Sequence, residues 1–128
     1  MSFEVAIARR IGEIEIAVEF QLGEGLLVLS GPSGSGKTSI LNMIAGILRP
    51  DQGRIRLHDR TLFDSAARID EPPERRRIGY VFQDGRLFPH RCVKDNLLYG
   101  FRLTGAADHW LTFDDAVAFL GVGHLLNR

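Results

Sequence analysis

The sequence of 128 residues contains only one cysteine, Cys92, so no disulfide can form within the chain. A chain without disulfides is typical of an intracellular protein. The sequence also lacks a surplus of either charge, because 16 Lys and Arg balance 16 Asp and Glu. A balanced charge gives no support to sequence-independent binding of nucleic acid, so we expect no nucleic-acid partner.

Long apolar runs are missing as well. The apolar runs that occur, such as 26–29, are far too short to span a bilayer. The first residues also lack the basic stretch and the apolar stretch of a secretory signal. The four histidines show no zinc-like spacing with each other or with Cys92, so no structural metal is predicted. We expect any association with a membrane to depend on a partner.

Two stretches near the start have the patterns of β-strands. Apolar and polar residues alternate from Ile14 to Phe20, as in a strand with one buried face, whereas 26–29 is apolar throughout, as in a strand covered on both faces. A glycine-rich loop and a helical apolar pattern over 40–48 follow, and Pro50 predicts the end of that helix. This order of elements predicts an α/β fold with a parallel core.

Five further segments are predicted along the rest of the chain. Alternation over 54–58 and 61–63 predicts a hairpin, and 78–82 predicts another buried strand. The polar stretch 64–77, with two adjacent prolines, predicts an exposed loop. Helical spacing of apolar residues predicts short helices over 93–101 and 113–120.

A complete phosphate-binding motif, G-x-x-x-x-G-K-[ST], lies between the predicted strand and the predicted helix. Its glycines let successive N–H groups turn toward phosphate oxygens, and the helix directs its positive dipole end at the same place. Lys37 brings a positive charge to the β- and γ-phosphates, and the hydroxyl of Thr38 can coordinate Mg²⁺. The predicted nucleotide-binding residues are Gly31, Pro32, Ser33, Gly34, Ser35, Gly36, Lys37, Thr38 and Ser39.

Gln83 is the second candidate, because it ends the predicted strand 78–82. Ligands bind at the carboxyl edge of parallel sheets, where the amide oxygen of Gln83 could complete a Mg²⁺ shell or hold a water near the γ-phosphate. Taken alone, such a glutamine is more often a loop residue that caps its own turn. The phosphate-binding motif upstream favours the functional interpretation, with Thr38 and Gln83 as predicted Mg²⁺ ligands.

The motif over 31–38 and the string Val-Phe-Gln-Asp-Gly-Arg-Leu-Phe-Pro-His over 81–90 together resemble the first half of an ATP-binding cassette, the ATPase of ABC transporters. The string over 81–90 is similar to that of molybdate-importer ATPases. The resemblance implies a P-loop NTPase core with an antiparallel β subdomain over 1–84 and the start of a helical subdomain over 85–128. It also implies ATP and Mg²⁺ as cofactors, with Gln83 as the sensor of the γ-phosphate and Mg²⁺.

The partners that the resemblance implies are the transmembrane permease subunits of an importer and a second ATPase subunit. It places the protein at the cytoplasmic face of the inner membrane, peripheral through the permease. Leu87 and Phe88 would lie near the groove that receives a coupling helix of the permease, and packing inside the helical subdomain is the equal alternative. For Arg75, Arg76 and Arg77, a solvated loop is preferred over contact with lipid headgroups.

The sequence also departs from the family pattern. The signature motif, the Walker B aspartate, the catalytic glutamate and the switch histidine do not occur in it, and 9–12 offers no aromatic residue for adenine. We therefore expect these 128 residues to bind nucleotide weakly or not at all and not to hydrolyse it, since no group activates a water. Without a neighbouring strand, 26–29 should expose an apolar edge that makes the chain poorly soluble.

Two other interpretations stay open. The phosphate-binding motif also fits a soluble kinase or a DNA-repair cassette, although the string over 81–90 favours the transporter. Alternatively, the chain is a catalytically inactive, truncated cassette that acts as a nucleotide-binding or interaction module.

Overall fold

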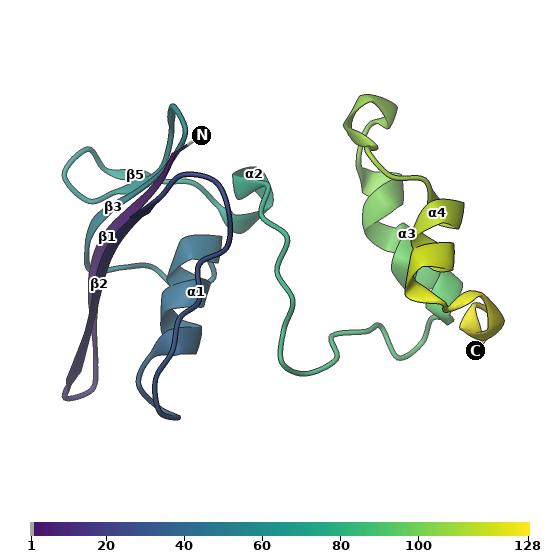
Figure 1. The fold of residues 1–128 in the computed structure, drawn as a ribbon, viewed down its shortest axis with the longest axis horizontal. Helices are drawn as coiled ribbons and strands as arrows, with labels where there is room; N and C mark the ends of the chain where they lie inside the picture. Colours follow the sequence, from purple (N-terminus) through teal and green to yellow (C-terminus); the bar gives the residue numbers. More distant parts are fainter. Residues whose placement is uncertain (1) are drawn as a thin grey trace. The chain divides into compact units, whose positions relative to one another are not determined.

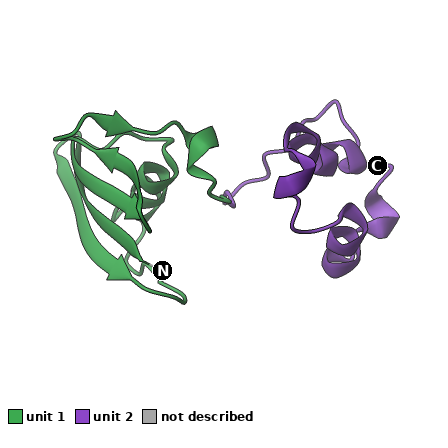
Figure 2. Ribbon diagram, turned by 90° about the horizontal axis from the view of Figure 1, so that it is seen from above, with its two compact units in different colours: residues 1–80 green, residues 81–128 purple. Residues whose placement is uncertain are grey.

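A computed structural model describes residues 2–128, which form two compact units (Figure 2). Unit 1 ends at Tyr80, and unit 2 runs from Val81 to Arg128. The two units have different architectures, because unit 1 contains the sheet and unit 2 contains only helices and loops. Each unit is described by itself below.

Unit 1 is built on a five-stranded antiparallel sheet in the order β2-β1-β3-β4-β5 (Figure 1). The predicted strand over 14–20 and the predicted hairpin over 54–63 are both confirmed. The strands are β1 (Phe3–Ile11), β2 (Ile14–Leu22), β3 (Gln52–Leu57), β4 (Arg60–Asp64) and β5 (Ile69–Asp70). No parallel pairing occurs among residues 2–128, so the expected parallel core is not found in this part of the protein.

Helix α1 (Lys37–Ala45) covers one face of this sheet (Figure 1). The buried core of unit 1 combines strand side chains with one side chain of the helix: Val5, Ile7, Ile16, Ile55, Leu62 and Phe63 from the strands and Met43 from α1. The helix ends at Ala45, before Pro50, which was predicted to end it. Gly46 takes a left-handed conformation with φ 85°, and its N–H donates to the carbonyls of the last turn.

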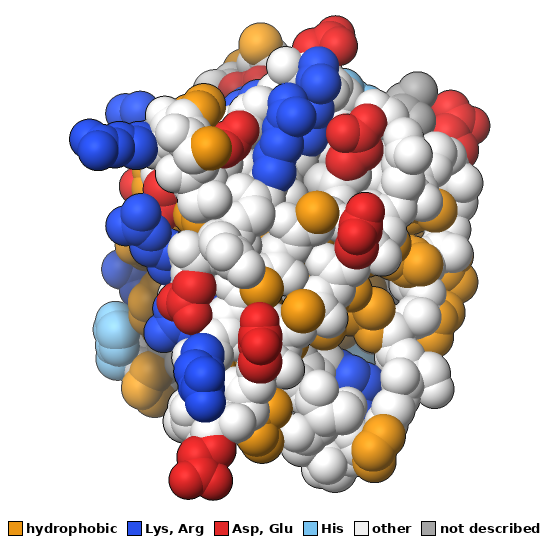
Figure 3. Space-filling view, turned by 90° about the vertical axis from the view of Figure 1, so that its left-hand side faces the viewer, with side chains coloured by type: hydrophobic (Ala, Val, Ile, Leu, Met, Phe, Trp, Pro, Cys, Tyr) orange, Lys and Arg blue, Asp and Glu red, His pale blue; other side chains and the backbone are white. Residues whose placement is uncertain are grey.

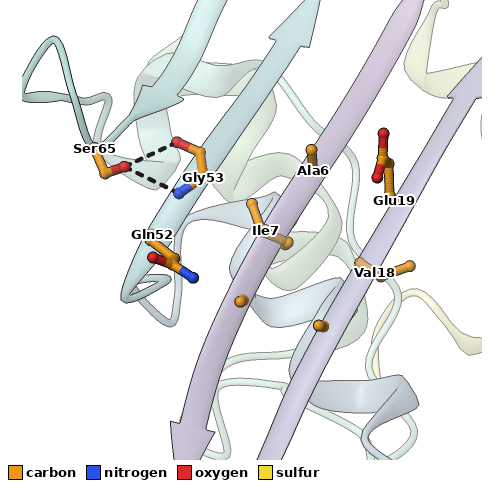
Figure 4. A pocket seen from close by; sticks show the side chains of 9 residues that line it. Ala6, Ile7, Val18, Glu19, Gln52, Gly53 and Ser65 are labelled. Carbon is orange, nitrogen blue, oxygen red and sulfur yellow. Dashed lines mark hydrogen bonds between the residues drawn. The ribbon is translucent and has the colours of Figure 1, made fainter.

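The opposite face of the sheet is open and carries mixed charges. Figure 3 shows acidic and basic side chains interspersed on it. A shallow hollow of about 560 Å³ lies over β1, β2 and β3 (Figure 4), where Ala6, Ala8 and Ala17 have small side chains. Gly53 and Ser65 also line it, and the N–H of Gly53 donates to Oγ of Ser65 over 3.0 Å. These small side chains account for the hollow.

The stretch 64–77 is largely exposed, as its polarity predicted, but it is not a loop throughout. It contains β5 and the short helix α2 (Pro73–Arg76), and Arg76 is only 1% exposed. Its guanidinium donates to the carbonyls of Met43 over 3.1 Å and Ile44 over 2.9 Å, which belong to the last turn of α1. Arg76 therefore neither lies in a solvated loop nor contacts lipid headgroups. It is buried because its guanidinium donates to carbonyls that have no partner within the helix at the end of α1.

Two segments predicted as buried strands, 26–29 and 78–82, are not strands. Leu26 is 87% exposed, Val28 70% and Val81 96%. An apolar strand needs a partner on either side, and residues 2–128 supply none to either segment. The strand prediction is wrong here, while the expected exposure of apolar side chains at 26–29 is confirmed.

Unit 2 contains the helices α3 (Val93–Leu103) and α4 (Phe113–Leu120), which confirm both predicted helices. Two 3₁₀ turns, η1 (Ala106–Asp108) and η2 (Gly123–Leu125), follow them. Thr112 caps α4 by accepting a hydrogen bond from the N–H of Asp115 over 3.1 Å. None of the helices described for residues 2–128 has the length and apolarity needed to cross a bilayer.

Candidate functional site

The phosphate-binding motif forms the turn that opens α1. Gly34 and Gly36 have φ values of 81° and 98°, a left-handed conformation that favours glycine. The N–H of Ser35 donates to the carbonyl of Pro32 over 3.2 Å, and the N–H of Ile40 donates to that of Gly36 over 2.9 Å. The loop therefore turns back on itself and continues directly into the helix, as the sequence predicted.

Gly36 also lies close to the sheet. A Cβ atom at this position would come within 2.8 Å of Cδ1 of Ile16 on β2. The left-handed backbone favours glycine here, and a larger residue would also have to displace the side chain of Ile16. This contact fixes the start of α1 against β2, and it therefore fixes where the loop lies.

Lys37 folds its amine back over the loop. Its Nζ donates to the carbonyls of Gly31 over 2.6 Å and Pro32 over 2.8 Å, and it lies 3.4 Å from Oγ of Ser35. The positive charge is thus held at the loop by main-chain oxygens. Because a phosphate oxygen is a stronger partner for an ammonium than a neutral carbonyl, a bound phosphate can take over these bonds.

The first turn of α1 is open to an anion. Gly36 provides no side-chain cap, and the turn contains no acidic residue. The first N–H groups of a helix have no partner within the helix, and the dipole makes this end partly positive. Thr38 is exposed on the same turn, and Ser39 is half-buried. This arrangement suits the phosphates of a nucleotide and a hydroxyl ligand for Mg²⁺.

A small apolar pocket of about 240 Å³ adjoins the loop. It lies between the end of the β1–β2 hairpin and the first turn of α1, and its walls are Ile11, Ile14, Ile16, Gly34, Gly36, Thr38 and Ser39. The sequence pattern indicated that 9–12 has no aromatic residue for adenine, but it did not indicate a pocket lined by these isoleucines. The signal that could have revealed them is the apolar pair Ile11 and Ile14 on either side of the Gly12–Glu13 turn.

Gln83 lies in an exposed bend of unit 2, not at the end of a buried strand. Beside it, the guanidinium of Arg86 contacts the carboxylate of Asp84 at 3.3 Å and lies 4.4 Å from the ring centre of Phe82. The phosphate-binding loop belongs to unit 1. A shared Mg²⁺ site with Thr38, and the sensing of the γ-phosphate, stay predictions.

Leu87 and Phe88 differ in their surroundings. Leu87 is 70% exposed, whereas the ring of Phe88 packs on Tyr99 of α3 with centroids 4.6 Å apart. The guanidinium of Arg91 lies over both rings, 5.6 Å and 5.4 Å from their centres. Phe88 therefore packs within unit 2 and still keeps part of its ring at the surface.

The motif G-x-x-x-x-G-K-[ST], in a loop that opens directly into a helix, defines the class of P-loop nucleotide-binding proteins. Residues 15–128 match the model of the ABC transporter family, and the chain belongs to this family. This assignment disagrees with the soluble-kinase interpretation.

Several curated relatives cover nearly the whole chain. It is 47% identical over 125 residues to the molybdenum import ATP-binding protein ModC of Rhodospirillum rubrum, covering 98% of this chain and 34% of that protein. It is 48% identical over 128 residues to ModC of Mesorhizobium japonicum, covering 100% of this chain and 35% of that protein. It is 52% identical over 124 residues to ModC of Brucella melitensis, covering 97% of this chain and 34% of that protein. The chain spans about a third of the length of these relatives.

Proposed function

We propose that residues 1–128 form the phosphate-binding part of the ATP-binding subunit of an ABC importer for molybdenum. In such an importer, ATP binding and hydrolysis drive solute uptake. The observation that carries the proposal is the open first turn of α1 under a complete phosphate-binding loop, in a chain that is about half identical to molybdenum import ATP-binding proteins. The partners we propose are permease subunits and a second ATPase subunit, at the cytoplasmic face of the membrane.

The proposed ligand is ATP with Mg²⁺. The loop N–H groups and the first turn of α1 bind the phosphates, and the amine of Lys37 exchanges its carbonyl partners for phosphate oxygens. The hydroxyl of Thr38 joins the Mg²⁺ shell, to which the amide oxygen of Gln83 also belongs in this proposal. Each role follows from the donor and acceptor chemistry of the residue.

The nucleoside, we propose, packs against the isoleucine wall of the pocket beside the loop. Ile11 is 41% exposed and Ile14 is 60% exposed, so both have apolar surface left to bury. The isoleucine side chains offer no hydrogen-bond donor or acceptor to the edge of a base, which is where adenine and guanine differ. This supports weak discrimination between ATP and GTP.

Hydrolysis needs a group that orients or activates the attacking water, in addition to the phosphate clamp and Mg²⁺. The residues of this sequence supply the clamp and part of the Mg²⁺ shell. We expect residues 1–128, assayed by themselves, to release no phosphate from ATP.

The experiment that tests nucleotide binding is a titration of the chain with a fluorescent ATP analogue and Mg²⁺. Lys37→Ala should weaken binding roughly ten- to a hundredfold, since a hydrogen bond to a charged group contributes about 1.5–3 kcal/mol. Lys94→Ala is the matched control, because Lys94 is the other lysine of the chain and lies exposed on α3. Equal affinities for all three proteins would mean that the loop does not bind phosphate.

A further inference from the structure

The loop 88–92 of unit 2 has no regular secondary structure. One side chain, that of Asn96, forms hydrogen bonds with the main chain of three of its residues. Asn96, in the first turn of α3, accepts a hydrogen bond from the N–H of Phe88 over 2.7 Å through Oδ1. Its Nδ2 donates to the carbonyls of Phe88 over 3.3 Å, Arg91 over 3.2 Å and Cys92 over 3.0 Å. One carboxamide therefore contacts four polar groups of the loop.

Asn96 and Tyr99 together fix Phe88. The carboxamide pairs with both the N–H and the carbonyl of Phe88, while the ring of Phe88 packs on Tyr99, three residues further along α3. Residues three apart lie on the same side of a helix. The main chain and the side chain of Phe88 are thus held by one face of α3.

The start of α3 does not depend on Asn96. The N–H groups of Val93 and Lys94 donate to the carbonyls of Arg128 and Leu126, each over 2.9 Å. These bonds satisfy two of the N–H groups that a helix leaves free at its first turn. Removing the carboxamide should therefore release the loop 88–92 while the helix remains.

We propose that Asn96 is a positioning residue for the contact with the permease. The inference rests on the proposed function and on the expectation, implied by the resemblance, that Leu87 and Phe88 lie near the groove that receives a coupling helix of the permease. Asn96 holds Phe88 in place before the partner arrives, with Leu87 exposed beside it. Without Asn96 the partner must order the loop on binding, and each residue ordered costs conformational entropy.

The test compares Asn96→Asp with the unchanged chain. Aspartate has nearly the same shape and keeps an acceptor for the N–H of Phe88, but it presents oxygen instead of NH₂ to three carbonyls. Asn127→Asp is the matched control, because Asn127 is exposed in the same unit and the same charge is added. The probe is the detergent-solubilised permease of the Brucella melitensis molybdenum importer.

We expect Asn96→Asp to bind the permease about tenfold more weakly and to be cut faster by trypsin after Arg91. Its helix content and its affinity for the fluorescent ATP analogue should stay unchanged, and Asn127→Asp should behave like the unchanged chain. A purely structural defect would lower helix content as well. If Asn96→Asp loses helix content, Asn96→Ser, which keeps one donor and one acceptor, is measured in its place.

The outcomes separate the two proposals. If the unchanged chain and Asn96→Asp bind the permease equally well, Asn96 is not a positioning residue and the inference is overturned. If the unchanged chain itself does not bind the permease, the proposed partner is wrong, and the inference falls with it.

Discussion

Gly46 and Arg76 occupy adjoining space, although 30 positions separate them in the sequence. A Cβ atom at Gly46 would lie 2.6 Å from Nε of Arg76. The guanidinium fills the space that the glycine leaves and donates to the last carbonyls of α1, to Glu71 and to Asp70. Burial lowers the pKa of Arg76 while the charge of Asp70 opposes this change, and arginine stays charged throughout the range in which proteins fold.

Replacing Arg76 by alanine should lower the free energy of unfolding by about 3 kcal/mol or more. The change leaves two helix-end carbonyls and the carbonyl of Glu71 without their donor and opens a cavity behind Gly46. Urea unfolding measures the effect. The exposed neighbour Arg75→Ala is the control and should change stability by less than about 0.5 kcal/mol. Similar losses for both variants would contradict a special role for Arg76.

Gly53→Ala should destabilise unit 1 by about 1–3 kcal/mol, since an added atom in a packed position forces the backbone to shift. The new Cβ would lie 2.0 Å from the carbonyl oxygen of Ala6 on the neighbouring strand, and Gly53 has a φ of 122°. Thermal unfolding checks this, with Gly79→Ala as control because nothing lies within 4 Å of a Cβ there. An unchanged melting temperature for Gly53→Ala would refute the clash.

Among single residues, the sequence revealed those that belong to a contiguous motif and missed those that act across the fold. Lys37 and the loop glycines were predicted because their spacing alone defines the phosphate-binding motif. Arg76 was missed because its partners are main-chain carbonyls of a distant helix. The isoleucine pocket was missed because a hairpin has to bring Ile11 and Ile14 beside the loop.

Among the elements, local periodicity was a sufficient guide wherever the partner lies nearby. Strand β2, the β3–β4 hairpin and both helices of unit 2 form where their own apolar patterns predict them. The segments 26–29 and 78–82 failed because a strand covered on both sides depends on strands that are remote in sequence. Ile78 and Tyr80 nevertheless pack within unit 1: Ile78 lies against the core, and the hydroxyl of Tyr80 donates to Oδ1 of Asn42 over 2.6 Å.

The exposed apolar stretch 26–29 should control how the chain associates with itself. We expect Leu26→Lys to shift gel-filtration profiles at high concentration toward the monomer, because a charge on an unpaired apolar segment opposes edge pairing. Leu103→Lys is the control, since Leu103 is 73% exposed but lies on α3. If both variants or neither reduce association, the stretch 26–29 is not its cause.

At the scale of the whole molecule, burial is concentrated in unit 1. All residues of the buried core belong to it, and none of residues 81–128 is fully buried. A chain segment as short as unit 2 buries a smaller fraction of its surface on folding than a larger domain does, so we expect its stability to be marginal. The compact units divide at Tyr80, while the subdomain boundary expected at residue 84 stays a prediction.

Hydrogen exchange should therefore differ between the units. Amides of β1 and β3 should exchange only through global opening of unit 1, whereas amides of α3 and α4 should exchange through local opening of lower free energy. Mass spectrometry of peptic fragments measures both sets in one sample. Equal protection of strands and helices would show that unit 2 is as stable as unit 1.

Cys92 connects the loop held by Asn96 to the first turn of α3, and it is the only thiol in the sequence. A maleimide dye would therefore attach at one defined position without any substitution, next to the segment proposed to meet the permease. The natural sequence thus carries its own attachment point for a spectroscopic reporter.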